Sequence, residues 1–170
     1  MVFCNKLYCG STKAKKMMHL NIDNEYEAKL AILLHGVILK NKESESAYCK
    51  AMERAVSADL KAHFQDKFTK HKRFDETLTR EVSVAFSQLP PVAWRNSNKD
   101  LWIDTETIVR LSDDASMLKV CIQGDRAAVR EYAVLLEKYS LPFDVYHVIR
   151  KHKMFIELDL HKASKIKDLH

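Results

Sequence analysis

Glycine and proline are scarce in this sequence, with 3 of each among 170 residues. β-Turns, barrel corners and phosphate-binding loops depend on these two residues, and above all on glycine. β-Sandwiches and barrels are therefore disfavoured, and so are P-loop and dinucleotide-binding motifs. The composition instead predicts a mostly helical chain whose length suits one domain.

Long apolar runs are also missing. The chain contains no stretch of about 18 uncharged apolar residues, and its first 22 residues have no apolar run of signal-peptide length. The 4 cysteines include no Cys-x-x-Cys pair, which favours a reducing compartment. We therefore expect a cytoplasmic protein that does not enter a membrane.

The net charge of +5 is unevenly distributed along the chain. Before Asp23, the only Lys, Arg, Asp or Glu residues are Lys6, Lys13, Lys15 and Lys16. The rest of the chain is nearly neutral, whereas a nucleic-acid-binding domain usually holds cations on one face, so nucleic acid is disfavoured as a partner. We expect residues 1–22 to form a flexible basic arm and residues 23–170 to form a single domain.

Apolar residues recur at helical spacing in four segments. The predicted helices are about 25–56, 58–86, 112–139 and 142 to the end of the chain. Short connections join the first to the second and the third to the fourth, so each pair should form an antiparallel hairpin. Between the hairpins lies a connection of roughly 25 residues, long enough to run the length of a bundle. Apolar residues within it predict a short helix.

Local signals agree with these boundaries. Ser57 or Asp59 can cap the second helix, Pro90 and Pro91 end it, and Ser112-Asp113-Asp114 is typical of a helix start. The predicted fold class is all-α, a ferritin-like four-helix bundle of two antiparallel helical hairpins joined by a long crossover that contains a short helix.

Polar residues interrupt the apolar stripe of every predicted helix. Those on inward positions are Asn41 and Glu45 in the first helix, His71 in the second, Asp125 in the third, and His152 and Asp159 in the fourth. Residues equally far from a tight turn lie at the same depth, so Glu45 should be level with His71. By the same reasoning Asp125 should be level with Glu157 or Asp159. Buried charges must be neutralised by one another, by water or by a metal.

A metal centre is one interpretation of this layer. Di-iron and di-manganese sites in ferritin-like bundles take one Glu from each of two helices and Glu-x-x-His from the other two. The sequence contains no Glu-x-x-His, so a complete dinuclear site is not expected. The candidate ligands for a degraded or mononuclear site are Glu45, His71, Asp125 and Asp159. The alternative is a hydrogen-bonded layer that fixes the helix register without a metal.

Four short sequence motifs follow one another along the chain. The first predicted helix contains Glu43-Ser-Glu-Ser-Ala-Tyr-Cys-Lys-Ala51, and the second contains Arg73-Phe74-x-x-x-Leu78. Leu101-Trp102-Ile103-Asp104 and Cys121-Ile-Gln-Gly124-Asp125 follow. Over residues 24–169 the chain thus resembles an uncharacterised bacterial family of ferritin-like four-helix bundles, a domain of unknown function.

The resemblance implies a ferritin-like fold without an assigned activity. The acidic positions of the family are partly replaced in this chain. Ile122 and Asp125 stand where the family has the two Glu residues of Cys-Glu-Arg-Gly-Glu, and Lys70-His71 stands where Glu-Arg is common. Glu45 aligns with a Glu of the family and is therefore the best remaining candidate ligand.

Two functions follow from these observations. The first is a non-catalytic helical-bundle protein with a structural, stress-related or interaction role, a degraded metal site and no cofactor. The alternative is a ferritin-like protein that binds iron or manganese through a partial carboxylate and histidine site. No catalytic residue is predicted, and self-association, for example as a dimer, is left open.

Overall fold

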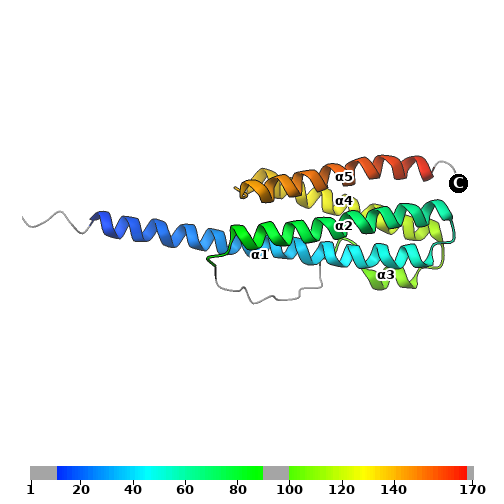
Figure 1. Cartoon of the computed structure of the whole chain (residues 1–170), viewed down its shortest axis with the longest axis horizontal. Coiled ribbons are helices and arrows are strands. Elements are labelled where there is room, and N and C mark those ends of the chain that lie inside the picture. The colour runs from blue at the N-terminus through cyan, green and yellow to red at the C-terminus, as the bar shows by residue number, and fades with distance from the viewer. Residues whose placement is uncertain (1–10, 90–99, 168–170) are drawn as a thin grey trace, which may run out of the picture.

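The computed structural model describes residues 11–89 and 100–167, and within these ranges it contains five α-helices and no strand (Figure 1). The helices are α1 (Ser11–Arg54), α2 (Ala58–Ala85), α3 (Thr105–Arg110), α4 (Asp114–Lys138) and α5 (Phe143–Lys167). The prediction of an all-α chain is confirmed. The long helices correspond to the predicted segments, and α3 is the short helix expected in the crossover.

The first helix begins earlier than predicted. α1 starts at Ser11 rather than near residue 25, so its backbone includes residues 11–22, which we expected in the flexible arm. Figure 1 shows this part of α1 extending beyond the ends of the other helices. Residues 1–10, the remainder of the expected arm, lie outside the described residues.

Side-chain caps set the starts of the helices, because the first N–H groups of a helix have no partner within it. At α2 the hydroxyl of Ser57 accepts a hydrogen bond from the N–H of Leu60 at 3.4 Å. At α4 the carboxylate of Asp113 accepts one from the N–H of Ser116 at 2.8 Å. Ser57 rather than Asp59 is therefore the cap of the second long helix.

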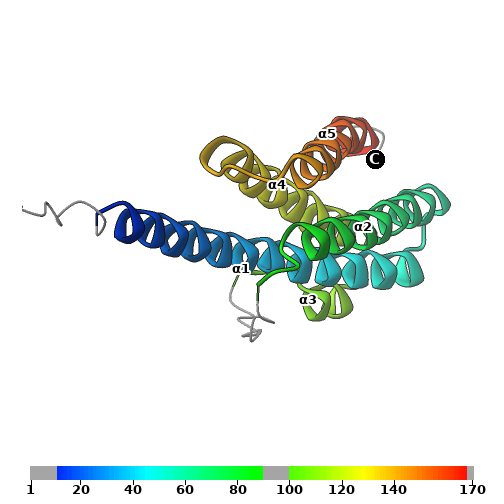
Figure 2. The ribbon, with the colours of Figure 1, turned by 60° about the vertical axis from the view of Figure 1, so that its left-hand side comes forward.

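The helices form two hairpins that pack on each other. α1 lies against α2, and α4 lies against α5, as the short connections predict. α5 packs beside α2, while α3 lies against the outside of α1. Figure 2 shows that α4 is inclined to the other long helices, so the two hairpins are not strictly parallel. The apolar core fills the space between the hairpins.

Hydrogen bonds connect the turn between α1 and α2 to the start of α4. The Asp114 carboxylate accepts hydrogen bonds from the N–H groups of Val56 at 2.9 Å and Ser57 at 2.8 Å. The Arg54 guanidinium donates to the carbonyl oxygen of Leu111 at 2.7 Å. These bonds anchor one end of the first hairpin to the second hairpin.

The crossover passes very close to α4 at Gly124. A Cβ atom at this position would clash with Cγ1 of Ile103 and would lie 2.6 Å from the carbonyl oxygen of Trp102. Close packing of the crossover against α4 therefore requires glycine at position 124. Gly36, in α1, has no such neighbour, because a Cβ there would meet nothing within 4 Å.

We predict opposite effects for alanine at these two glycines. Gly124→Ala should lower the free energy of unfolding by about 1–3 kcal/mol, because the crossover backbone must move away from α4. Gly36→Ala should raise it by about 0.5–1 kcal/mol, because alanine is the better helix former. Urea denaturation of both variants checks the prediction, and an unchanged midpoint for Gly124→Ala would contradict the close approach.

Candidate functional site

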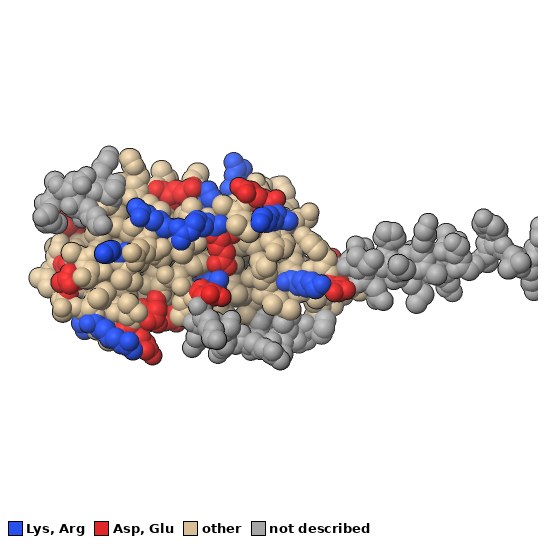
Figure 3. All heavy atoms as spheres, turned by 180° about the vertical axis from the view of Figure 1, so that it is seen from behind, with Lys and Arg blue, Asp and Glu red and all other residues tan. Residues whose placement is uncertain are grey.

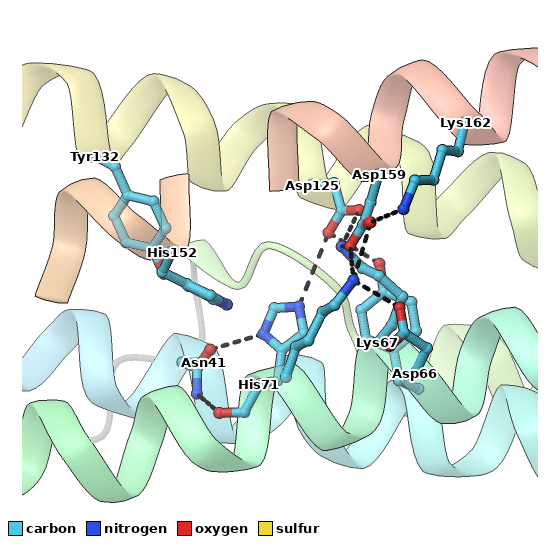
Figure 4. Close-up of polar contacts among 11 residues, drawn as sticks. Asn41, Asp66, Lys67, His71, Asp125, Tyr132, His152, Asp159 and Lys162 are labelled. Atoms are coloured by element: carbon cyan, nitrogen blue, oxygen red, sulfur yellow. Dashed lines mark hydrogen bonds and ion pairs between the residues drawn. The ribbon is translucent and has the colours of Figure 1, made fainter. Parts of the chain in front are cut away.

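A layer of buried polar side chains crosses the middle of the helix core (Figure 4). Each long helix contributes to it, and its members are between 0% and 5% exposed. We define the polar layer as Asn41, Tyr48, Lys67, His71, Asp125, His152 and Asp159. Because burial of each polar group is unfavourable without a partner, their contacts decide what the layer can do.

Lys67 of α2 lies at the centre of the charged half of the layer. Its ammonium nitrogen is 2.7 Å from Oδ2 of Asp125 and 3.7 Å from Oδ2 of Asp159. It also lies 5.4 Å from the centre of the Tyr48 ring, within cation–π range. A single buried cation thus neutralises carboxylates from both helices of the second hairpin.

Each of the two carboxylates has a second donor. The Tyr48 hydroxyl donates to Oδ1 of Asp125 at 2.9 Å. The Lys70 ammonium donates to both oxygens of Asp159 at 3.0 Å. Because Lys70 is partly exposed, Asp159 connects the interior of the layer to the surface. Lys70 also pairs with Asp66 at 2.6 Å, and Lys162 lies 3.8 Å from Asp159, so lysines surround this carboxylate on its outer side (Figure 4).

The other half of the layer is a neutral histidine cluster. The amide nitrogen of Asn41 donates to the backbone carbonyl of His71 at 2.9 Å, which leaves its amide oxygen to accept. That oxygen is 2.7 Å from Nδ1 of His71, so Nδ1 carries the proton. The Nε2 atom of His71 then carries no proton and can only accept a hydrogen bond. It lies 3.9 Å from Oδ1 of Asp125, beyond hydrogen-bond distance.

His152 of α5 lies beside His71 among aromatic rings. Its ring stacks on Phe74 with centroids 3.8 Å apart and meets the edge of His71 at 5.0 Å. Nδ1 of His152 is 3.2 Å from the hydroxyl of Tyr132, while its Nε2 atom has no hydrogen-bond partner. Burial, followed by repulsion from the nearby lysines, holds the pKa of His152 well below its ordinary value.

The same physical causes act on His71. Burial is the largest, followed by His152, Lys67 and Lys70, and together they hold the pKa of His71 well below its ordinary value. Both histidines are therefore neutral at pH 7. Burial also raises the pKa of the Cys121 thiol and the Tyr48 hydroxyl, so neither ionises readily. The layer contains no activated nucleophile.

The structure places three of the four candidate metal ligands in the layer. His71, Asp125 and Asp159 are buried, and the shared contact of the two aspartates with Lys67 agrees with the depth predicted for them. The inward position predicted for Glu45, level with His71, is wrong. Its side chain is only partly buried, and partial burial, followed by repulsion from Asp75, raises its pKa.

Glu45 misses the layer because the buried stripe of α1 follows alternating steps of four and three residues. Positions 37, 41, 44, 48 and 51 are buried, with Ile38 and Ala47 buried beside them, so Ser44 rather than Glu45 faces the core. Asn41 is the residue level with His71.

The same spacing explains why Lys67 was missed. The buried residues of α2 are 60, 64, 67, 71, 74 and 78, again in steps of four and three. Lys67 lies on this stripe, whereas Phe68 is only partly buried. A strict count of the stripe could have found it. Lysine is nevertheless among the residues least expected in a core.

The donor set does not fit a metal ion. Within the residues that the structure describes, no group of three or more His, Cys, Asp and Glu side chains is arranged to hold one. The Lys67 ammonium lies between the two carboxylates that would be the anionic ligands. A divalent cation would have to displace this ammonium and would add uncompensated positive charge to the core.

The segments that carry the family resemblance meet in this part of the structure. Tyr48 bonds Asp125, and Gly124 packs against Trp102. The Trp102 ring meets Tyr132 edge to face at 5.1 Å. Three of the four motifs therefore contact one another around the polar layer.

Comparison of the chain with protein-family models, curated proteins and solved structures finds no match. The resemblance to a ferritin-like family therefore stays a prediction. Over the described residues, none of the helices combines the length and the apolar character that crossing a membrane requires.

We predict that Lys67 makes a large contribution to the stability of the fold. Lys67→Met should lower the free energy of unfolding by about 3–5 kcal/mol, because it leaves two buried carboxylates without their shared cation. Lys61→Met, on the exposed face of α2, should change it by no more than about 0.5 kcal/mol. Chemical denaturation compares the two, and equal effects would contradict the central place of Lys67.

We also predict that stability falls in mildly acidic solution. Below pH about 6.5 the unfolded chain protonates both histidines, whereas the folded chain does not because their pKa values are lowered. Their stabilisation is therefore complete above about pH 6.5 and is lost as the pH falls towards the folded pKa values, by up to about 1.4 kcal/mol per pH unit for each histidine.

Urea denaturation between about pH 8 and about pH 5.5 measures this slope. His152→Phe keeps an aromatic ring against Phe74 and should make the slope shallower. The exposed His147→Phe should leave it unchanged. A slope that is identical in wild type and His152→Phe would show that the buried histidine does not control the pH dependence.

Proposed function

We propose that this chain is a non-catalytic, ferritin-like helical-bundle protein that acts through interaction with other protein surfaces. The observation that supports this proposal is the position of Lys67, whose ammonium lies between Asp125 and Asp159. In this arrangement the carboxylates hold α2 to α4 and α5, and the lysine takes the place that a catalytic metal would need.

The burial of the layer also favours a structural role. Lys67, His71 and Asp125 are nearly inaccessible, so a substrate would reach them only if the helices separated. The raised pKa of the buried Cys121 thiol argues against thiolate chemistry at this place. A general acid or base must reach the proton that it transfers, and the polar contacts of these groups are with other buried side chains of the layer.

The arrangement of the chain supports the ferritin-like part of the proposal. Two hairpins, α1–α2 and α4–α5, are joined by a crossover that contains α3. Three of the resemblance motifs pack together where the hairpins meet. A ferritin-like bundle whose ligands have been replaced by an internal ion pair accounts for both features.

Surface charge favours a protein partner over nucleic acid. On the face drawn in Figure 3, basic and acidic side chains lie next to one another and do not form a continuous basic stripe. Nucleic-acid-binding surfaces concentrate cations to neutralise successive phosphates. The rim of a protein–protein interface is polar and needs no excess of one charge.

Metal analysis tests the proposal. We predict that protein purified without chelator contains no stoichiometric iron, manganese or zinc, and that added Fe²⁺ or Mn²⁺ does not raise the melting temperature. Lys67→Glu is the comparison variant, because it replaces the ammonium with a third carboxylate near His71. This variant should melt at a lower temperature without metal and gain stability when Mn²⁺ is added.

Lys61→Glu serves as the matched surface control and should show no response to Mn²⁺. Stoichiometric iron or manganese in the wild type, lost on His71→Ala in a variant that still folds, would overturn the proposal. It would then favour the metal-binding alternative.

A further inference from the structure

Exposed apolar side chains gather on the outer face of α5. Phe143 is 75% exposed, Met154 is 51% exposed and Leu158 is 53% exposed. At about 100° per residue these three side chains fall within an arc of about 60°. The arc lies opposite Val145 and Ile156, which face the core. Met154 and Leu158 are one helical turn apart and form a short exposed apolar stripe, while Phe143 lies at the start of the same face, beyond the exposed His147 and Arg150.

A groove runs beside this stripe between α4 and α5. It encloses about 330 Å³, and its apolar lining comes from Ala133, Leu136, Tyr146 and Met154. Charged side chains, among them Arg150 and Glu157, line its edge. An apolar strip with a charged rim is the usual composition of a protein interface.

The charges at the rim are arranged in a self-complementary way. Arg150 has no hydrogen-bond or ion-pair partner within the part of the chain that the structure describes. Glu157 is 46% exposed and bonds Lys153 of its own helix at 2.7 Å. Arg150 and Glu157 are two helical turns apart, about 10.5 Å, and lie on the same side of α5.

A twofold axis perpendicular to α5 would place these two charges of one copy beside those of a second copy. If the axis passes between Lys153 and Met154, it exchanges positions 150 and 157 of two antiparallel helices. Arg150 of each copy then lies beside Glu157 of the other, so one rotation forms two ion pairs. The Met154 side chains then lie next to each other near the axis.

We propose that α5 is a homodimer interface that pairs antiparallel with α5 of a second copy, its centre at Met154 and its register set by Arg150 and Glu157. A second copy is the occupant that the charges favour, because the pattern is complementary to itself. The inference deepens the proposed interaction role by naming the partner and the surface.

Sedimentation velocity of the full chain tests the apolar part of the interface. The wild type should sediment as a dimer, and Leu158→Glu should raise the dissociation constant about tenfold or more, because a charge enters the apolar stripe. Ile32→Glu is the matched control, since Ile32 of α1 is also 53% exposed. It should leave the dimer intact.

A charge exchange tests the register. Arg150→Glu and Glu157→Arg should each yield monomers, because each places like charges opposite one another. The two variants mixed should form a heterodimer, since the four charges then pair as opposites. The double variant Arg150→Glu/Glu157→Arg should dimerise with itself. Circular dichroism melts verify that every variant is folded.

Three results would overturn the inference: a monomeric wild type, a dimer that Leu158→Glu and Ile32→Glu weaken equally, or folded single variants that fail to associate on mixing. None of these concerns metal content. Bound iron or manganese would instead contradict the non-catalytic role, so the two failures are distinguishable.

Discussion

The neutralisation of one buried ammonium group is the constraint on which the rest of this structure depends. Lys67 is 1% exposed, and a cation so far from water is tolerated only beside opposite charge. Asp125 of α4 and Asp159 of α5 supply that charge. The hydroxyl of Tyr48, in α1, donates a hydrogen bond to Asp125. The packing of the two hairpins must therefore bring all four long helices to this point.

This constraint also explains the character of the layer. Burial, followed by repulsion from Lys67 and Lys70, lowers the pKa of His71 and His152 and keeps both neutral. The lone pair of His71 cannot accept from a carboxylate, which leaves it 3.9 Å from Asp125. A charged half and a neutral half thus lie side by side in the layer.

Much of the fold was predictable from local physics. Helix periodicity, the Ser57 and Asp113 caps and the length of the crossover need only neighbouring residues to be understood, and the structure agrees with them. Inward positions were also predictable where the count held, as for Asn41, His71 and Asp159. The inward position predicted for Glu45 was wrong because an error of one residue along a helix rotates a side chain by about 100°. Here that rotation moves the side chain from the core to a partly buried position.

By itself the sequence determined the helical class, the order of the helices, the two hairpins and the presence of polar groups in the core. It did so because these properties depend on spacing along one chain. Only the tertiary structure decided which polar groups meet and which charge neutralises them. Lys67 could have extended its flexible side chain to water from a position beside the core. Whether its ammonium faces solvent or two carboxylates depends on how α4 and α5 pack against α2, a relation between distant segments that spacing along the chain does not contain.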